Sequence, residues 1–151
     1  MTHDHALTAS VKRSPDAVDL FMFSAVAWLT HRIHFDRDYA RSEGFRELVV
    51  HGPLQGAYIS EILSAAARRH GGRLERLAYR HKESAFCGDT LVIDTRISSV
   101  VDRDGGLDIG STVSVTVDGD RVVTEGHSTI WLPSQESLDR MIATAARGEL
   151  P

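Results

Sequence analysis

The second half of the chain alternates apolar and polar residues with a period of two, which is typical of strands with one buried face. Turns rich in Asp and Gly separate three such runs. The runs occupy residues 91–100, 107–117 and 122–132. This pattern predicts an antiparallel meander of three strands that ends at Pro133. Shorter runs at residues 73–84 and 18–24 predict a fourth and a fifth strand.

A different period appears in residues 51–72, where apolar side chains recur every three or four positions, as in an amphipathic helix. These recurring side chains are Leu54, Tyr58 and Ile62. Pro53 suits the first helical position, where its missing N–H costs nothing, and Gly71 supplies a left-handed stop. Several residues between the apolar positions are small, so we expect other elements to approach this helix closely. The helix is therefore predicted to be central.

The segments before this helix are shorter and more polar. Residues 1–17 are predicted to form a flexible arm. Ser24 is a candidate N-cap for a brief helix over residues 25–30. Asp36 or Asp38 is a candidate N-cap for another short helix that follows.

Together these elements predict one domain over residues 18–133, followed by an amphipathic C-terminal helix and tail over residues 134–151. The fold class is α+β, an antiparallel sheet of about five strands wrapped around one long central helix. The order of strand, helix and strand meander matches the hotdog fold. Such a sheet leaves an edge strand without a partner, so we expect the chain to pair with a second copy.

Composition narrows the class of protein. Of the 151 residues, 42% are hydrophobic and 25% are charged, which is ordinary for a globular domain. The formal net charge of −4 argues against a general nucleic-acid binder. The longest apolar stretch, residues 20–29, is roughly half of a bilayer span, so we expect no membrane helix. The N-terminus lacks the apolar core of a secretory signal, and Cys87 is the only cysteine, which favours a cytoplasmic setting.

Titratable side chains gather in the segment LTHRIHFDRDYA, residues 29–40. Imidazole has an unperturbed pKa of about 6.5, so His31 and His34 are candidates for acid–base catalysis near neutral pH. A metal site would use these two histidines with Asp36 and His51, but no metal-dependent motif is matched. We therefore expect no metal and no other cofactor. The alternative is a turn of structural histidines, with Asp36 as a helix cap.

The stretch FMFSAVAWLTHRIHFDRDYARSEGFRELVVHGPLQ, residues 21–55, resembles the MaoC-like dehydratases. It is most similar to the branch with mesaconyl-CoA hydratases and mitochondrial-type 3-hydroxyacyl-thioester dehydratases. Three joined pieces carry the resemblance: F-x-F-S-A, H-R-I-H-F-D and V-V-H-G-P-L-Q. The resemblance implies a hotdog fold and a hydro-lyase, which adds water reversibly to an enoyl thioester of coenzyme A or acyl carrier protein.

Family members related to this branch carry the pattern G-D-x-N-P-x-H-x-D, in which the first Asp and the His act on water and on the α-proton. On this chain the catalytic His corresponds to His34 and the family Asn to His31. The catalytic Asp corresponds to Leu29, where the closer branch usually has Asn, so the chain departs from both patterns. The family's oxyanion donor lies where the long helix begins, which makes the N–H of Gly52 the candidate.

The resemblance also suggests which residues bind the substrate. The candidates are His51, Pro53, Arg80, Lys82 and Phe86. Phe86 is a candidate for the acyl pocket. Arg80 and Lys82 belong to a basic run over residues 68–82 that could contact the phosphates of coenzyme A. The alternative for this run is a solvated helix end and the outer face of a strand.

Two other functions fit the same residues. Because Leu29 replaces the acid–base partner, the chain could be a non-catalytic or half-site hotdog subunit that supports a catalytic paralogue in a heteromer. A thioesterase is less favoured, because Glu61, the one acid on the long helix, lies about two and a half turns from its start. We expect a homodimer or higher hotdog oligomer, or such a heteromer, and neither nucleic acid nor membrane as a partner.

Overall fold

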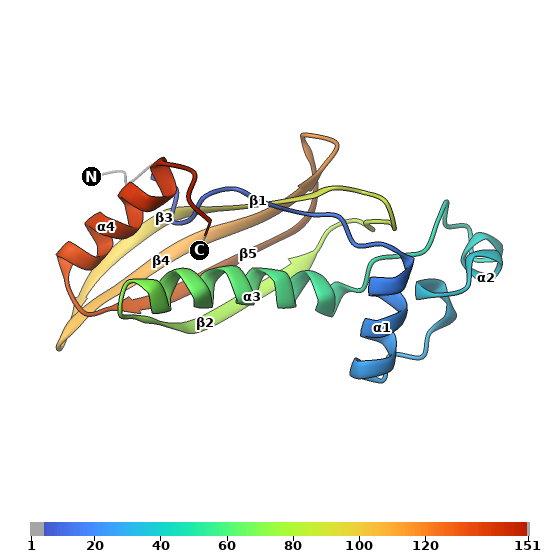
Figure 1. The fold of residues 1–151 in the computed structure, drawn as a ribbon, viewed down its shortest axis with the longest axis horizontal. Coiled ribbons are helices and arrows are strands. Elements are labelled where there is room, and N and C mark those ends of the chain that lie inside the picture. Colours follow the sequence, from blue (N-terminus) through green and yellow to red (C-terminus); the bar gives the residue numbers. More distant parts are fainter. Residues whose placement is uncertain (1–4, 151) are drawn as a thin grey trace.

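The computed structural model describes residues 5–150, and Figure 1 shows the arrangement of their helices and strands. In chain order the elements are β1 (Val11–Arg13), α1 (Ala17–Ala27), the 3₁₀ helix η1 (Arg32–His34), α2 (Arg37–Ser42), α3 (Gly52–Arg69), β2 (Arg73–His81), β3 (Leu91–Arg103), β4 (Gly106–Val117), β5 (Arg121–Leu132) and α4 (Gln135–Ala146). None of the helices in this described part is long and apolar enough to cross a membrane.

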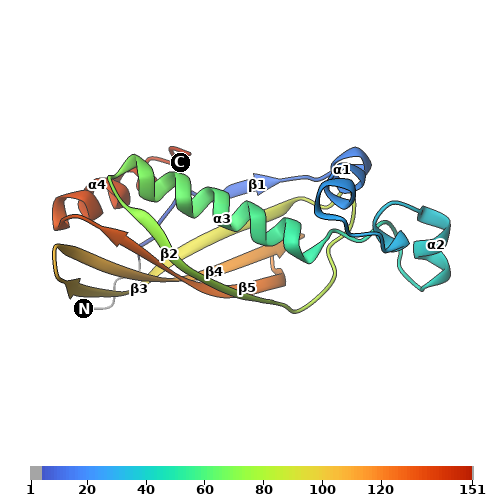
Figure 2. The same ribbon diagram turned by 90° about the horizontal axis from the view of Figure 1, so that it is seen from below.

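The strands form one antiparallel sheet in the order β1-β3-β4-β5-β2. The predicted meander is confirmed as β3, β4 and β5, and the predicted fourth strand is β2. Gly105 and Gly119 form the meander turns with φ of +79° and +93°, a conformation that costs glycine little. α3 lies along the inner face of the sheet, and Figure 2 shows α1 and α2 projecting beyond the N-terminal end of α3.

The core lies between α3 and the inner face of the sheet. Every second residue of β4 from Leu107 to Val117 is buried, as the period of two predicts. The helix contributes Ile59, Ile62 and Leu63, each at most 2% exposed. Full burial of one such side chain stabilises the fold by about 1.5–3 kcal/mol. The α+β fold with a central helix is therefore confirmed.

Two glycines let β2 approach α3 closely. A Cβ atom on Gly56 would lie 2.8 Å from Cε1 of Tyr79 and closer still to the hydroxyl group. A Cβ atom on Gly52 would lie 2.8 Å from Cδ2 of His81 and closer still to Nε2. Tyr79 and His81 are two residues apart and so share one face of the strand, and Gly52 and Gly56 are four apart and so share one face of the helix. Each ring therefore fills the space beside one glycine. The prediction that small residues permit close approach is confirmed.

The predicted strand over residues 18–24 is wrong, because this segment lies in α1. The Asp16 carboxylate accepts hydrogen bonds from the N–H groups of Val18 and Asp19 at 2.8 and 2.9 Å, and the Asp19 carboxylate accepts one from the Asp16 N–H at 3.0 Å. Such a capping box favours a helix, and a short apolar run has no period of its own to oppose it. Ser24 is consequently not an N-cap but a buried residue inside α1.

The predicted flexible arm over residues 1–17 is wrong for the part that the structure describes, and residues 1–4 lie outside it. β1 pairs with β3, placing Val11 opposite Ile93, and Leu7 is fully buried. A strand of three residues is too short to show a period of two, and its polar surroundings concealed it. The folded domain therefore begins well before residue 18.

The helices α2, α3 and α4 agree with the predictions, whereas η1 was not predicted. α3 lies within the predicted range 51–72, with Pro53 in its first turn and Gly71 at φ +78° beyond its end. Asp36 caps α2 by accepting a hydrogen bond from the Tyr39 N–H at 3.0 Å. α4 is the predicted C-terminal amphipathic helix, with Ser134 as its N-cap.

Candidate active site

His34 lies at the end of η1, half-buried near the start of α3. Its Nδ1 atom lies 2.7 Å from the carbonyl oxygen of Val49. A carbonyl only accepts, so Nδ1 carries the hydrogen and Nε2 keeps a free lone pair. Burial lowers the pKa of His34, the hydrogen bond to Val49 raises it in part, and the nearby His31 lowers it. The imidazole is therefore neutral at pH 7 and able to accept a proton.

His51 lies directly behind His34. The two rings stack with their centroids 3.8 Å apart and their planes inclined by 20°. Nε2 of His51 lies 2.8 Å from the Ser24 hydroxyl of α1, and Nδ1 has no hydrogen-bond partner among the described residues. Burial, followed by the effect of His34, lowers the pKa of His51 to about 4. His51 is 0% exposed, so in this structure it supports the His34 ring, and its contact with substrate stays a prediction.

The backbone of Val49, whose carbonyl orients His34, is held by hydrogen bonds to segments on both sides. The Val49 N–H donates to the Ile33 carbonyl at 3.0 Å, and Val49 forms a β-bridge with Phe86. The next residue, Val50, donates to the Ala85 carbonyl at 2.8 Å. The loop between β2 and β3 thus fixes the backbone that fixes the imidazole.

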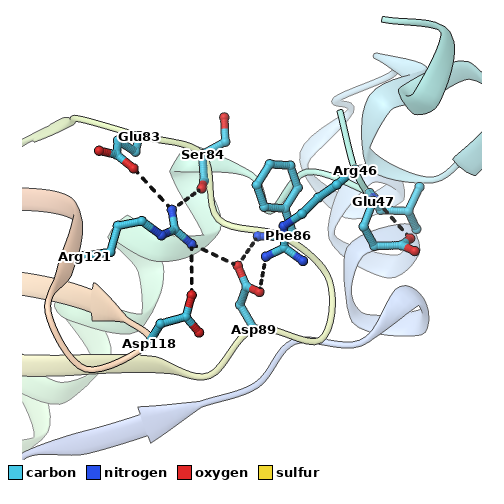
Figure 3. A network of polar contacts seen from close by, with 9 residues as sticks. Arg46, Glu47, Glu83, Ser84, Phe86, Asp89, Asp118 and Arg121 are labelled. Carbon is cyan, nitrogen blue, oxygen red and sulfur yellow. Dashed lines mark hydrogen bonds and ion pairs between the residues drawn. The ribbon is translucent and has the colours of Figure 1, made fainter. Parts of the chain in front are cut away.

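Asp89 anchors this loop, as Figure 3 shows. Its carboxylate accepts a hydrogen bond from the Phe86 N–H at 2.9 Å and pairs with the guanidinium groups of Arg46 and Arg121. The Arg46 guanidinium also lies 4.3 Å from the centroid of the Phe86 ring. Because the buried carboxylate is matched by two cations and an N–H group, it is stable there. Phe86, predicted to line the acyl pocket, packs between Arg46 and Phe45.

The first turn of α3 begins beside His34 and His51. The first N–H groups of a helix have no partner within the helix, and they carry the positive end of its dipole. The first backbone bond across this turn runs from the Gln55 N–H to the His51 carbonyl at 3.2 Å. Pro53 has no N–H and is exposed, so the first turn offers the N–H groups of Gly52 and Leu54, and Gly52 stays the predicted donor.

A third imidazole, which the sequence reasoning missed, lies beside Gly52. His81 ends β2, and its Nδ1 atom lies 2.8 Å from the Thr124 hydroxyl, which donates to Oε1 of Gln55 at 2.7 Å. Burial lowers the pKa of His81. The period of two in residues 73–84 could have revealed it, because Tyr79 and His81 share the face that meets the helix.

This geometry agrees with a comparison to protein families. The model of the hydroxyacyl-thioester dehydratase type 2 family matches residues 2–87, more than half of the chain. The chain belongs to this family. The matched segment contains the His34 region, all of α3 and the strand that carries His81, so the predicted family is confirmed.

Two relatives of known function resemble the chain. An (R)-specific enoyl-CoA hydratase from Rhodospirillum rubrum is 23% identical over 128 residues, which cover 85% of this chain and 87% of the relative. A mesaconyl-C(4)-CoA hydratase from Chloroflexus aurantiacus is 47% identical over 72 residues, which cover 47% of this chain and 23% of the relative. The chain therefore aligns with less than a quarter of the second relative's length.

Solved structures share the fold of this family member. The (R)-hydratase from A. caviae has a TM-score of 0.75 at 19% identity, covering 85% of this chain and 96% of that one. A MaoC-like dehydratase from Rhodospirillum rubrum has a TM-score of 0.70 at 15% identity, covering 87% and 92%. The ChsH1-ChsH2 complex from Mycobacterium tuberculosis contains a chain with a TM-score of 0.68 at 16% identity, covering 87% and 99%. These likenesses confirm the predicted hotdog fold.

The other polar positions of the pattern G-D-x-N-P-x-H-x-D are held by Leu29, His31 and Asp36, of which Asp36 alone keeps the residue of the pattern. His31 is exposed and caps η1, because its Nδ1 accepts from the Ile33 N–H at 3.4 Å. Leu29 follows α1, with its N–H bonded to the Ser24 carbonyl at 2.9 Å, and its side chain cannot exchange protons. Asp36 caps α2, and its bonds to the Tyr39 N–H and to Arg32 hold its pKa below the usual range.

Arg80 and Lys82, predicted to bind phosphates, do not join this group. Neighbouring strand residues point to opposite faces, so Arg80 faces away from α3 while His81 faces it. Arg80 Nε lies 2.7 Å and Lys82 Nζ 3.5 Å from the same Glu125 carboxylate oxygen. Arg80 and Glu125 line a hollow of about 580 Å³ formed by β2, β4 and β5. Within residues 5–150, no three His, Cys, Asp or Glu side chains are placed to hold a metal ion.

Proposed function

We propose that this chain is a hydro-lyase that adds water reversibly to the double bond of an enoyl thioester of coenzyme A or acyl carrier protein. The observation that carries the proposal is His34, which stands in the family pattern with a free Nε2 beside the start of α3. The named activities of the two hydratase relatives support the reaction class.

The proposed chemistry needs a base, an oxyanion donor and a proton at carbon. Nε2 of His34 takes a proton from water while the water oxygen bonds to the β-carbon. The electrons of the double bond move toward the thioester oxygen, where the Gly52 N–H and the positive end of α3 stabilise the negative charge. A proton then adds to the α-carbon. Dehydration follows the same steps in reverse.

The test is loss of the ultraviolet absorbance of the enoyl thioester with purified protein, over acyl groups of several lengths and branched diacids. His34→Asn is expected to lower kcat by at least about 100-fold, the usual contribution of acid–base catalysis. His127→Asn, an exposed histidine on β5, is the matched control and is expected to retain activity. Equal rates in wild type and His34→Asn would refute the site.

Thiol release measured in the same reactions distinguishes a thioesterase. Glu61, the acid on α3, is 63% exposed and lies 3.4 Å from the Arg13 guanidinium, so it faces solvent at the β1 side of the helix. We expect hydration without release of free thiol. Thiol release that depends on Glu61 would revive hydrolysis.

We also propose that a second hotdog chain covers α1 and the edge of β2. The α1 segment exposes large apolar side chains, which surface helices of a lone domain rarely do. They are Val18, Phe21, Met22, Val26 and Trp28, each more than half exposed. β2 lies at one edge of the sheet. Light scattering of the purified chain is expected to give at least the mass of a dimer; a stable monomer would contradict the pairing.

A supporting subunit is the second candidate function, and Leu29 is the observation that favours it. Two structural relatives, the ChsH1-ChsH2 and HadBC complexes, contain two kinds of chain. The two candidates differ in one measurement. A purified homo-oligomer that hydrates substrate by itself excludes the supporting role, whereas turnover that appears only after addition of a co-purified paralogue establishes it.

A further inference from the structure

The ring of His81, the last residue of β2, packs against the start of α3. Its ring fills the space beside Gly52, with Nε2 as the nearest ring atom to a Cβ at that position. His34 is connected to this helix start through His51, the residue before Gly52, because the two rings stack with centroids 3.8 Å apart. Two imidazoles from elements far apart in the sequence therefore border one helix start.

The hydrogen bonds of His81 fix its tautomer. The Thr124 hydroxyl donates its hydrogen to Gln55 Oε1 at 2.7 Å, so toward His81 it can only accept. Nδ1 of His81 consequently carries the hydrogen, and Nε2 holds a lone pair at the Gly52 side. Thr124 and Gln55 are 0% and 3% exposed, so this pair of bonds holds the ring from inside the core. His34 has the same tautomer through Val49.

The proposed reaction requires two proton transfers, one at water and one at the α-carbon. In the segment before α3, His31 is the other imidazole beside His34, but it is exposed and its Nδ1 accepts from the Ile33 N–H to cap η1. Leu29 is aliphatic, Asp36 is held by a helix cap and by Arg32, and Nδ1 of His51 is enclosed in the interior. The sheet side of Gly52 offers another proton-exchanging group, the His81 ring.

We propose that His81 is the second acid–base residue of this site and exchanges the proton at the α-carbon of the substrate; this assignment rests on the proposed function. The α-carbon is bonded directly to the carbonyl carbon whose oxygen meets the Gly52 N–H, so His81 beside Gly52 is nearer to it than to the β-carbon. In hydration, protonated His81 gives its Nε2 proton to the α-carbon while neutral His34 takes one from water. The pair then re-equilibrates through solvent.

The surroundings of His81 suit such exchange. Toward α3 the ring meets Gly52, and the first turn of that helix carries no acidic side chain. Along β2 the ring of Tyr79 is 5.5 Å away, between centroids, and β5 presents the uncharged Thr124. The neighbouring cations Arg80 and Lys82 are both paired with Glu125. The ring is thus free of an ion pair that would lock its charge.

The decisive variant is His81→Asn. The Asn amide is able to donate to Thr124 in place of Nδ1, but it has no group that exchanges protons. We expect kcat for hydration to fall at least about 100-fold while KM stays within about threefold. His127→Asn is the same substitution at an exposed histidine and is expected to change neither value. Thermal unfolding followed by circular dichroism checks that each variant is folded.

A second variant separates chemistry from packing. His81→Ala leaves a space beside Gly52, and added imidazole is expected to restore at least about tenfold of the lost kcat, with no effect on His34→Asn. A folded His81→Ala that imidazole does not restore, or a His81→Asn with kcat within threefold of wild type, overturns the assignment. If either variant is unfolded, His81→Gln replaces it and is judged by the same threefold limit. If His34→Asn loses hydration activity but the His81 variants keep it, only this inference is refuted. If the wild type does not hydrate the thioester, the proposed function is refuted as well.

Discussion

The Asp89 carboxylate provides a quantitative test of how the loop between β2 and β3 supports the site. Its side chain is 8% exposed and pairs with Arg46 and Arg121, and it accepts the Phe86 N–H at 2.9 Å. Asp89→Ala removes all of these interactions together. Phe86 forms the β-bridge with Val49, so the same substitution loosens the carbonyl that orients His34.

The size of the effect follows from the exposure of the partners. Breaking a fully buried ion pair costs about 3–5 kcal/mol. Here Arg46 and Arg121 are 56% and 29% exposed, so both guanidinium groups recover much of their hydration in the variant. We therefore expect the free energy of unfolding to fall by about 2–3 kcal/mol. In a domain of this size that lowers Tm by roughly 4–12 °C.

Urea unfolding of wild type, Asp89→Ala and Glu83→Ala measures this difference. Glu83 also contacts Arg121, at 3.4 Å, but it is 56% exposed, so its loss is expected to cost less than about 0.5 kcal/mol. In the hydration assay, Asp89→Ala is expected to lower kcat about tenfold through misplacement of His34. If the two alanine variants unfold at the same urea concentration, Asp89 is not the anchor described above.

Buried groups allow three further tests. The folded chain holds His51 at a pKa of about 4, below about 6.5 in the unfolded chain, so the unfolded state binds more protons between these values. The free energy of unfolding therefore falls as the pH drops from 6.5 toward 4, by up to about 3 kcal/mol. Urea unfolding across this range should show this slope in wild type and a smaller slope in His51→Gln. Because burial lowers the pKa of His34, the acidic limb of kcat/KM is expected below pH 6.5, and a midpoint above 6.5 would contradict its assignment as the base. Gly56→Ala places a methyl group against the Tyr79 ring and is expected to destabilise the fold by about 1–3 kcal/mol, with thermal unfolding showing partial recovery when Tyr79→Ala is added.

Long elements were predictable because their periodicity comes from one buried face. The alternation in β4 and the helical spacing in α3 both describe contact with the same core, and the structure places them there. α1 was not predictable in this way, because it is apolar on most sides and its short run fits a strand equally well. Its signal was the pair Asp16 and Asp19, which forms the capping box. β1 has three residues and carries no readable period.

The site residues divide in a similar manner. His34 was identifiable because its motif is local in sequence, and Asp36 because a helix cap acts on its own neighbours. His81 acts across a strand and a helix, and its partners Gly52, Gln55 and Thr124 are scattered over more than 70 positions. The pairing of β2 with β5 places His81 opposite Thr124, and the packing of β2 on α3 brings His81 to Gly52. Arg80 and Lys82 carry the positive charge that phosphates require, but strand alternation directs Arg80 to the other face.

The candidate site residues lie on two parts of the fold that are joined at two places. His34 belongs to the segment that projects beyond the sheet, whereas Gly52 begins α3 and His81 ends β2, so their separation depends on the junctions between these parts. One junction is the bond of Ser24 to His51, and the other is the Asp89 anchor of the loop that holds Val49. A change at either junction shifts one proton-exchanging ring relative to the other without removing either. Such changes should lower kcat more than they raise KM, since the transition state is more sensitive than substrate binding to this distance.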